Sequence, residues 1–181
     1  MIVRLSDFRR RFNVSWTTLL AGWRGFESYR RLITISDIQQ FAMEKLEIAM
    51  EKSKIAGESS SNLSELTIFW AVEQDEIDSA LDVLSATDST NYETEVHKWV
   101  ICLLEKQIQE LPDDPIYGLL ELTNFWSSLE YPDYSPHQIQ GVGNEISPQN
   151  YYTQENFKNA VEKHKNWIEN ECRKLSGSSI S

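Results

Sequence analysis

Residues 94–112 read TEVHKWVICLLEKQIQELP, and their pattern decides the fold class. Apolar side chains recur three and four positions apart, at Val96, Trp99, Val100, Leu103, Leu104 and Ile108. This spacing places them on one face of an α-helix rather than on alternate sides of a strand. Asn91 or Thr94 can cap the N-terminus, and Pro112 ends the helix because proline lacks the N–H that another turn would need. The stretch therefore predicts a long amphipathic helix.

The helical periodicity continues downstream, with one interruption. Pro115 stands where a first helical turn tolerates proline, which predicts a helix from there to the residues before Pro132. A final helix is predicted from Thr153 to Leu175, and the tail at 176–181 is expected to fray. Residues 131–152, between these helices, are rich in Pro, Gly, Asn and Tyr. They predict a long irregular loop, and loops of that length are usually functional or mobile.

Upstream residues predict four further helices. Ser15 is expected to cap a short helix that Gly22 and Gly25 end, and Ser36 a longer one that stops near residue 56. A polar loop at 58–62 follows. Two apolar stripes, over residues 63–70 and 77–84, then predict a helical hairpin with its turn at 74–75.

About seven helices joined mostly by short connections make an all-α protein. We predict a single domain over residues 1–181, built as an irregular helical bundle or a short stack of helical hairpins. A chain of 181 residues is long enough to bury one hydrophobic core. The sequence lacks a run of roughly 18 apolar residues and an apolar signal sequence at its start, so we expect a cytoplasmic protein that does not insert into a membrane.

Charge is distributed unevenly along the chain. Residues 1–31 hold seven Arg and two acidic residues, a net charge of +5, whereas the other 150 residues hold 10 basic and 26 acidic residues, a net charge of −16. No Lys or Arg occurs between Lys54 and Lys98. Because nucleic-acid binding depends on Lys and Arg that displace counterions from phosphates, this distribution argues against nucleic acid as a partner. It predicts attraction to a basic protein.

The helix predicted over residues 77–84 has an acidic outer face. Asp75, Asp78 and Asp82 fall on its successive turns. The acids that we predict to bind a partner are Glu73, Asp75, Glu76, Asp78, Asp82 and Asp88. The alternative for the same residues is a solvated surface without a partner.

The sequence offers little for catalysis or metal binding. His97, His137 and His164 have no zinc-ligand spacing to one another or to a cysteine, and His164 falls near the apolar face of the final helix, as a core histidine would. The two cysteines lie far apart among apolar helical neighbours, which argues against a disulfide framework. We predict no catalytic residue, no metal site and no cofactor.

The loop at 131–152 is a second candidate binding region. Tyr134, His137 and Tyr151 are predicted as further partner-binding residues, because aromatic side chains beside Pro and Gly are frequent in binding loops. Packing of the same rings beneath the loop explains them equally well. If the chain is an enzyme of unrecognised type, its site would lie under this loop and include His137, Glu145 and Tyr151.

Four dispersed motifs carry a family resemblance. They read SWTTLLAGW at 15–23, IQQFAMEKL at 38–46, PDYSPHQIQG at 132–141 and KHKNWIENE at 163–171. Through them, and over nearly its whole length, the chain resembles the bacterial family called domain of unknown function 2247. That family has no assigned enzymatic activity, so the resemblance implies a small stand-alone helical protein of bacteria and no catalytic residue.

The chain is also similar in style to the immunity proteins that neutralise bacterial toxins, many of which are basic nucleases. Analogy at this level is weak evidence about function. The leading hypothesis is a non-enzymatic protein-binding module, an immunity protein that covers a basic toxin with its acidic helical surface. An enzyme with its site under the 131–152 loop and a homo-oligomeric scaffold are the alternatives, and the sequence leaves the oligomeric state open.

Overall fold

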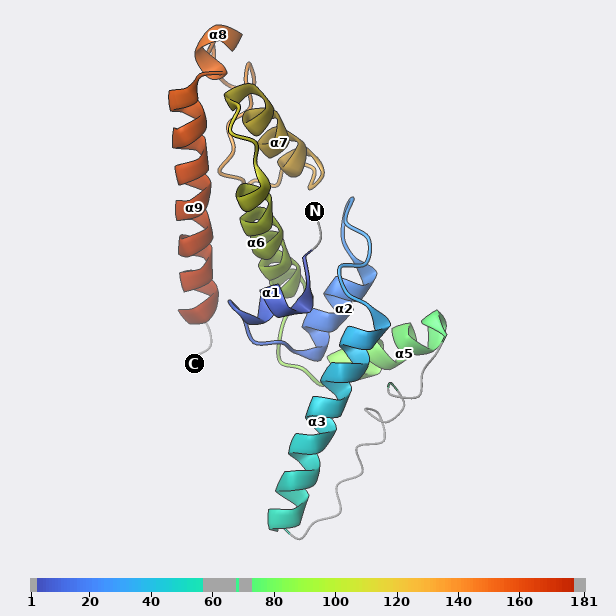
Figure 1. Cartoon of the computed structure of the whole chain (residues 1–181). Helices are drawn as coiled ribbons and strands as arrows, with labels where there is room; N and C mark the ends of the chain where they lie inside the picture. The colour runs from blue at the N-terminus through green and yellow to red at the C-terminus, as the bar shows by residue number, and fades with distance from the viewer. Residues whose placement is uncertain (1–2, 57–67, 69–72, 178–181) are drawn as a thin grey trace. The chain divides into compact units, whose positions relative to one another are not determined.

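The computed structural model describes residues 3–56, 68 and 73–177. Its helices are α1 (Leu5–Arg9), α2 (Trp16–Arg24), α3 (Ile35–Ala56), α5 (Gln74–Ser85), α6 (Tyr92–Glu110), α7 (Pro115–Ser127), α8 (Pro148–Tyr151) and α9 (Gln154–Gly177) (Figure 1). No β-strand occurs among the described residues. The predicted all-α class is confirmed.

Capping side chains fix several helix starts where the sequence predicts them. Ser15 Oγ accepts the N–H of Thr18 at 3.2 Å before α2. Of the two caps considered for α6, Asn91 is the one used, since its Oδ1 accepts the N–H of Glu93 at 2.8 Å. Asp114 caps α7 in the same way. These bonds satisfy N–H groups that the first turn of a helix leaves without an intrahelical acceptor.

Several predicted boundaries are wrong by a few residues, among them the turn expected at 74–75, because these two residues are the start of α5. α3 begins before Ser36, because Thr34 is the cap: its Oγ1 accepts the N–H of Asp37 at 3.2 Å, and the Asp37 carboxylate accepts the N–H of Thr34 at 2.8 Å. α2 continues through the buried Gly22 and ends at Arg24, so that of the two predicted glycines only Gly25, as the C-cap, marks the end of the helix. Gly25 adopts φ 72°, a left-handed value that glycine reaches without steric cost.

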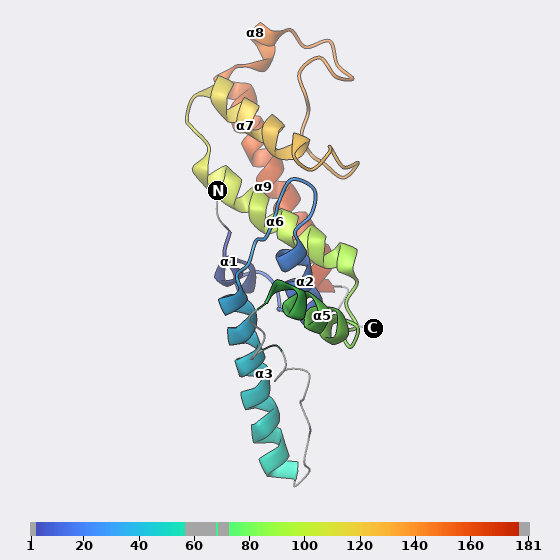
Figure 2. The same cartoon turned by 90° about the vertical axis from the view of Figure 1, so that its right-hand side faces the viewer.

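The sequence did not predict α1 and α8. α8 lies inside the loop expected at 131–152, where Ser147 Oγ accepts the N–H of Asn150 and Pro148 occupies the first turn. The chain between α7 and α8 is otherwise irregular and forms the long trace beside these helices in Figure 2. The predicted polar loop at 58–62, the tail from 178 and all but residue 68 of the helix expected at 63–70 lie outside the described residues.

By its internal contacts, the chain divides into two compact units. The N-terminal unit comprises residues 4–26 and 30–96, and the C-terminal unit comprises residues 1–3, 27–29 and 97–181. α6 therefore contributes residues to both units. The single folding domain predicted from the sequence stays a prediction.

In the N-terminal unit, α2 packs against α5. The Trp16 ring meets the Phe41 ring edge to face, with their centroids 4.8 Å apart. The apolar stripe predicted for the helix at 77–84 is confirmed, because its members are all buried: Ile77, Ala80, Leu81 and Leu84. Because this stripe is buried, the other sides of α5 are the ones that can face α2 or the solvent.

In the C-terminal unit, α7 packs against α9. Gly118 permits this approach, because a Cβ built at that position would overlap the ring of Phe157. Trp99 on α6 and Trp126 on α7 are completely buried. The Trp126 ring meets the Trp167 ring of α9 edge to face, with their centroids 5.5 Å apart.

Candidate functional site

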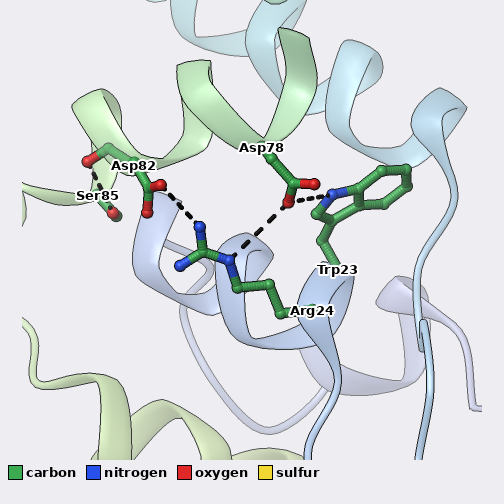
Figure 3. A network of polar contacts seen from close by, with 5 residues as sticks. All are labelled: Trp23, Arg24, Asp78, Asp82 and Ser85. Carbon is green, nitrogen blue, oxygen red and sulfur yellow. Dashed lines mark hydrogen bonds and ion pairs between the residues drawn. The ribbon is translucent and has the colours of Figure 1, made fainter. Parts of the chain in front are cut away.

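α5 turns two of its aspartates toward α2 (Figure 3). The indole N–H of Trp23 donates to Asp78 at 2.9 Å, and the Arg24 guanidinium lies 2.7 Å from Asp82 and 3.9 Å from Asp78. The hydrogen bond with Asp82 is the largest cause that raises the pKa of Arg24. Because a buried indole N–H requires an acceptor and Trp23 is 3% exposed, the fold itself uses the Asp78 carboxylate.

Asp88 is also used within the N-terminal unit. Its carboxylate accepts the N–H of Thr17 at 2.7 Å and the hydroxyl of Thr17 at 2.9 Å. The Thr17 N–H lies in the first turn of α2, where a negative charge is favourable, so Asp88 caps this helix from a distant part of the chain. At the next residue, the hydroxyl of Thr18 donates at 2.6 Å to the fully buried Glu95.

The prediction that Asp75, Asp78 and Asp82 form one solvent-facing row is therefore wrong. Asp78 faces Trp23, and Asp82, although its side chain is 54% exposed, is paired with Arg24. Helical periodicity shows which residues share a face, but it does not show which neighbouring helix approaches that face. The Arg-rich N-terminal stretch and the acidic middle of the chain meet here within one unit.

The solvent side of α5 carries Asp75, Glu76, Ser79 and Val83, all exposed. Val83 is 60% exposed. The Glu76 carboxylate accepts the N–H of the exposed Glu73 at 3.2 Å, whereas Asp75 has no hydrogen bond or ion pair within the described part of the chain. Three of the acids predicted to bind a partner make no hydrogen bond or ion pair with α2 in the described part of the chain: Glu73, Asp75 and Glu76.

Tyr134, the first of the predicted loop residues, packs on aromatic neighbours. Its ring stacks on that of Trp167 with centroids 6.0 Å apart, and meets the His97 ring at 4.6 Å. The His97 imidazole in turn lies 3.1 Å from Glu171. Tyr134 nevertheless remains 43% exposed, so one part of the ring supports the loop while another part faces solvent.

The other two loop residues, His137 and Tyr151, line a single pocket with His164 of α9. The pocket has a volume of about 160 Å³. Tyr151 is buried, and its hydroxyl donates to the backbone oxygen of Gln138 at 2.6 Å. Glu145, the third residue of the enzyme alternative, is not among the residues that line this pocket.

His164 forms the buried side of the pocket and uses both ring nitrogens. The indole N–H of Trp126 donates to Nε2 at 2.9 Å, and Nδ1 lies 2.6 Å from the Ala160 carbonyl. An indole N–H can only donate, so the proton of the neutral ring is on Nδ1. Burial lowers the pKa of His164 to about 4. The imidazole is therefore neutral at pH 7 and has no nitrogen left for a ligand.

His137 keeps one nitrogen without a partner. Its Nε2 lies 2.8 Å from the hydroxyl of Thr123, which donates its single proton to the Leu119 carbonyl at 2.9 Å. The hydroxyl can then only accept, which fixes the His137 proton on Nε2. Nδ1 is buried and has no hydrogen-bond partner in the described part of the chain, an arrangement that typically costs about 1–3 kcal/mol. Burial lowers the pKa of His137 to about 3.

Comparison with known proteins places the chain in a family. A family model described as an uncharacterized protein conserved in bacteria, DUF2247, matches residues 6–172. The chain belongs to this family. The resemblance seen in four dispersed motifs is thereby confirmed. No curated protein and no solved structure matches the chain.

None of the described helices combines the length and the apolar character needed to cross a bilayer. Nowhere in the described residues do three or more His, Cys, Asp or Glu side chains come together as metal ligands would.

Sequence reasoning found part of the pocket of this DUF2247 chain. It singled out His137 and Tyr151 in the loop, but it treated His164 as a core histidine and did not consider Lys163 or Asn159, which also line the pocket. The burial of His164 is confirmed. A usable signal was present in α9, where Asn159 and Lys163 stand one turn apart beside the apolar face.

Proposed function

We propose that the chain is a non-enzymatic protein-binding module that engages a basic protein through the outer face of α5. The observation that supports this most directly is the exposed apolar side chain of Val83 on the same helix face as the exposed carboxylates of Asp75 and Glu76. An apolar centre with a charged rim is the usual anatomy of a protein interface.

The surrounding charge favours a basic partner. Eight carboxylates lie between residues 73 and 95, and no Lys or Arg occurs between Lys54 and Lys98. Arg24 from α2 offsets one of these charges. Opposite charge on a partner would accelerate association toward about 10⁸–10⁹ M⁻¹s⁻¹ at low salt.

Such rapid association suits the neutralisation of a toxin. Within this proposal, the partner is a basic toxin domain whose substrate site the α5 surface covers, and the chain acts as its immunity protein. The support for this finer assignment is the acidic surface together with the size and helical character of the chain.

Two charge-reversal variants of the full chain test the α5 surface. One is Asp75→Lys, at an exposed position of α5. The matched control is Asp113→Lys, which makes the same change in net charge at an exposed position of the C-terminal unit. A photo-crosslinking residue at the exposed Ser79 captures partners from a lysate of the source bacterium.

We expect the chain with its native charges to capture a basic protein. The amount captured should fall about tenfold in the α5 variant and less than about twofold in the control. Capture should also fall as salt shortens the range of the charge interaction. Equal losses in the two variants would contradict a site on α5, and the absence of a salt-sensitive basic partner would contradict the function.

A further inference from the structure

The pocket beneath the 131–152 loop differs from the rest of this acidic chain in its polar groups. It is lined by ten residues: Leu119, Pro136, His137, Gln138, Tyr151, Asn156, Asn159, Ala160, Lys163 and His164. None of them is acidic, although the chain has 28 Asp and Glu residues. The lining is therefore suited to a ligand that carries negative charge, because no carboxylate among the lining residues would repel it.

Two side chains on the rim are available to such a ligand. Lys163 and Asn159 are exposed, stand one turn apart on α9 and have no hydrogen bond or ion pair within the part of the chain that the structure describes. An ammonium and a side-chain amide at this spacing offer donors to both oxygens of one carboxylate. Both residues also line a second, more open groove, together with Glu162 and Trp167.

We propose that this pocket binds a small organic carboxylate, with its anionic group between Lys163 and Asn159 and its apolar part against Leu119 and Ala160. This site is separate from the acidic surface of α5 and does not depend on the protein-binding function.

The size of the pocket favours an organic acid over an inorganic ion. A volume of about 160 Å³ corresponds to roughly five water molecules at the density of the liquid. A single inorganic anion would leave much of that space to water. An acid of roughly five to eight non-hydrogen atoms would fill it and cover the apolar wall.

The two histidines give the site a readout. Both are neutral at pH 7, so Lys163 supplies the positive charge, and its charge contributes to lowering the pKa of His137 and of His164. A carboxylate beside Lys163 would offset that contribution. Bound ligand should therefore shift the ring resonances of His137 and raise its pKa.

Nuclear magnetic resonance of the full chain, with sodium butyrate as the probe, tests the proposal. Butyramide serves as the uncharged probe of the same shape, and inorganic phosphate as an anion without an apolar part. The variant Lys163→Gln removes the charge at the site. Lys165→Gln is its matched control, since Lys165 is exposed on the same helix but does not line the pocket.

We expect butyrate to give saturable shifts of the His137 and His164 ring resonances, and butyramide to bind about tenfold more weakly. Lys163→Gln should weaken butyrate binding by about tenfold and Lys165→Gln by less than about twofold. The proposal is overturned if butyrate gives no saturable shift, if butyramide or phosphate binds as tightly, or if the two lysine variants weaken binding equally.

Discussion

Lowering the pH from 7 to 5 should destabilise the fold, because two buried histidines resist protonation. Burial lowers the pKa of His137 to about 3 and that of His164 to about 4, from an ordinary value of 6.5. In the unfolded chain both rings titrate near the ordinary value. Between that value and the folded pKa, the unfolded state binds more protons than the folded state, so stability is lost as the pH falls. His97, whose pKa is also lowered by burial, acts in the same direction.

The size of the effect follows from the two shifts. At pH 5 an unfolded histidine with the ordinary pKa is almost fully protonated, whereas a folded one with a pKa near 4 is mostly neutral. Each of His137 and His164 then removes about 2 kcal/mol of unfolding free energy between pH 7 and pH 5, and the pair about 4 kcal/mol. That is a large part of the roughly 5–15 kcal/mol by which most domains are stable.

Urea unfolding at pH 7, 6 and 5 measures this loss, with the double variant His137→Gln and His164→Gln as the comparison. Glutamine at position 164 retains an oxygen that can accept from Trp126, and neither glutamine titrates. The double variant should be less stable at pH 7 but should show a much shallower dependence on pH. The reasoning is refuted if the native chain differs by less than about 1 kcal/mol between pH 7 and pH 5, or if the variant keeps the same slope.

Three further predictions, each checked by urea unfolding at pH 7, concern packing and capping. Trp99→Ala should destabilise by about 3–5 kcal/mol because the ring is completely buried, and a loss below about 1 kcal/mol would show that it is no core anchor. Gly118→Ala should cost about 1–3 kcal/mol through overlap with Phe157, and combining it with Phe157→Leu should recover part of that loss. Asp88→Ala should cost about 1–2 kcal/mol by removing the cap of α2, whereas Asp75→Ala should stay within about 0.5 kcal/mol; similar values for both would contradict the capping role.

The helices were predictable because their signals are local. Apolar residues three and four apart mark a buried helix face, and side-chain caps such as Ser15 and Asn91 act within a few residues of the groups they satisfy. The errors have the same origin. Thr34 and Ser36 are both good caps, and the choice between them depends on the reciprocal bond from Asp37. The single turn of α8 is too short to produce a periodic pattern.

The pocket was less predictable because its parts come from separate segments. The composition of the loop drew attention to His137 and Tyr151, but no local pattern says that the loop returns to α9 beside His164. That return depends on tertiary contacts, among them the bond from the Tyr151 hydroxyl to the Gln138 carbonyl. The rim residues Lys163 and Asn159 were overlooked for the same reason, since Lys163 looks like any exposed lysine on a surface helix.

Within the acidic run, the sequence alone does not distinguish the carboxylates that the fold uses from those that remain exposed. The fold uses some of these carboxylates and not others: Asp78 satisfies Trp23, while Asp75 has no partner within the described chain. Lysine at position 78 would leave the buried indole N–H without an acceptor and would place a second cation beside Arg24. Reversing a whole row of aspartates would therefore confuse loss of fold with loss of binding. Reversal of Asp75 alone avoids this, because it changes the charge that a partner would meet and leaves the α2–α5 network intact.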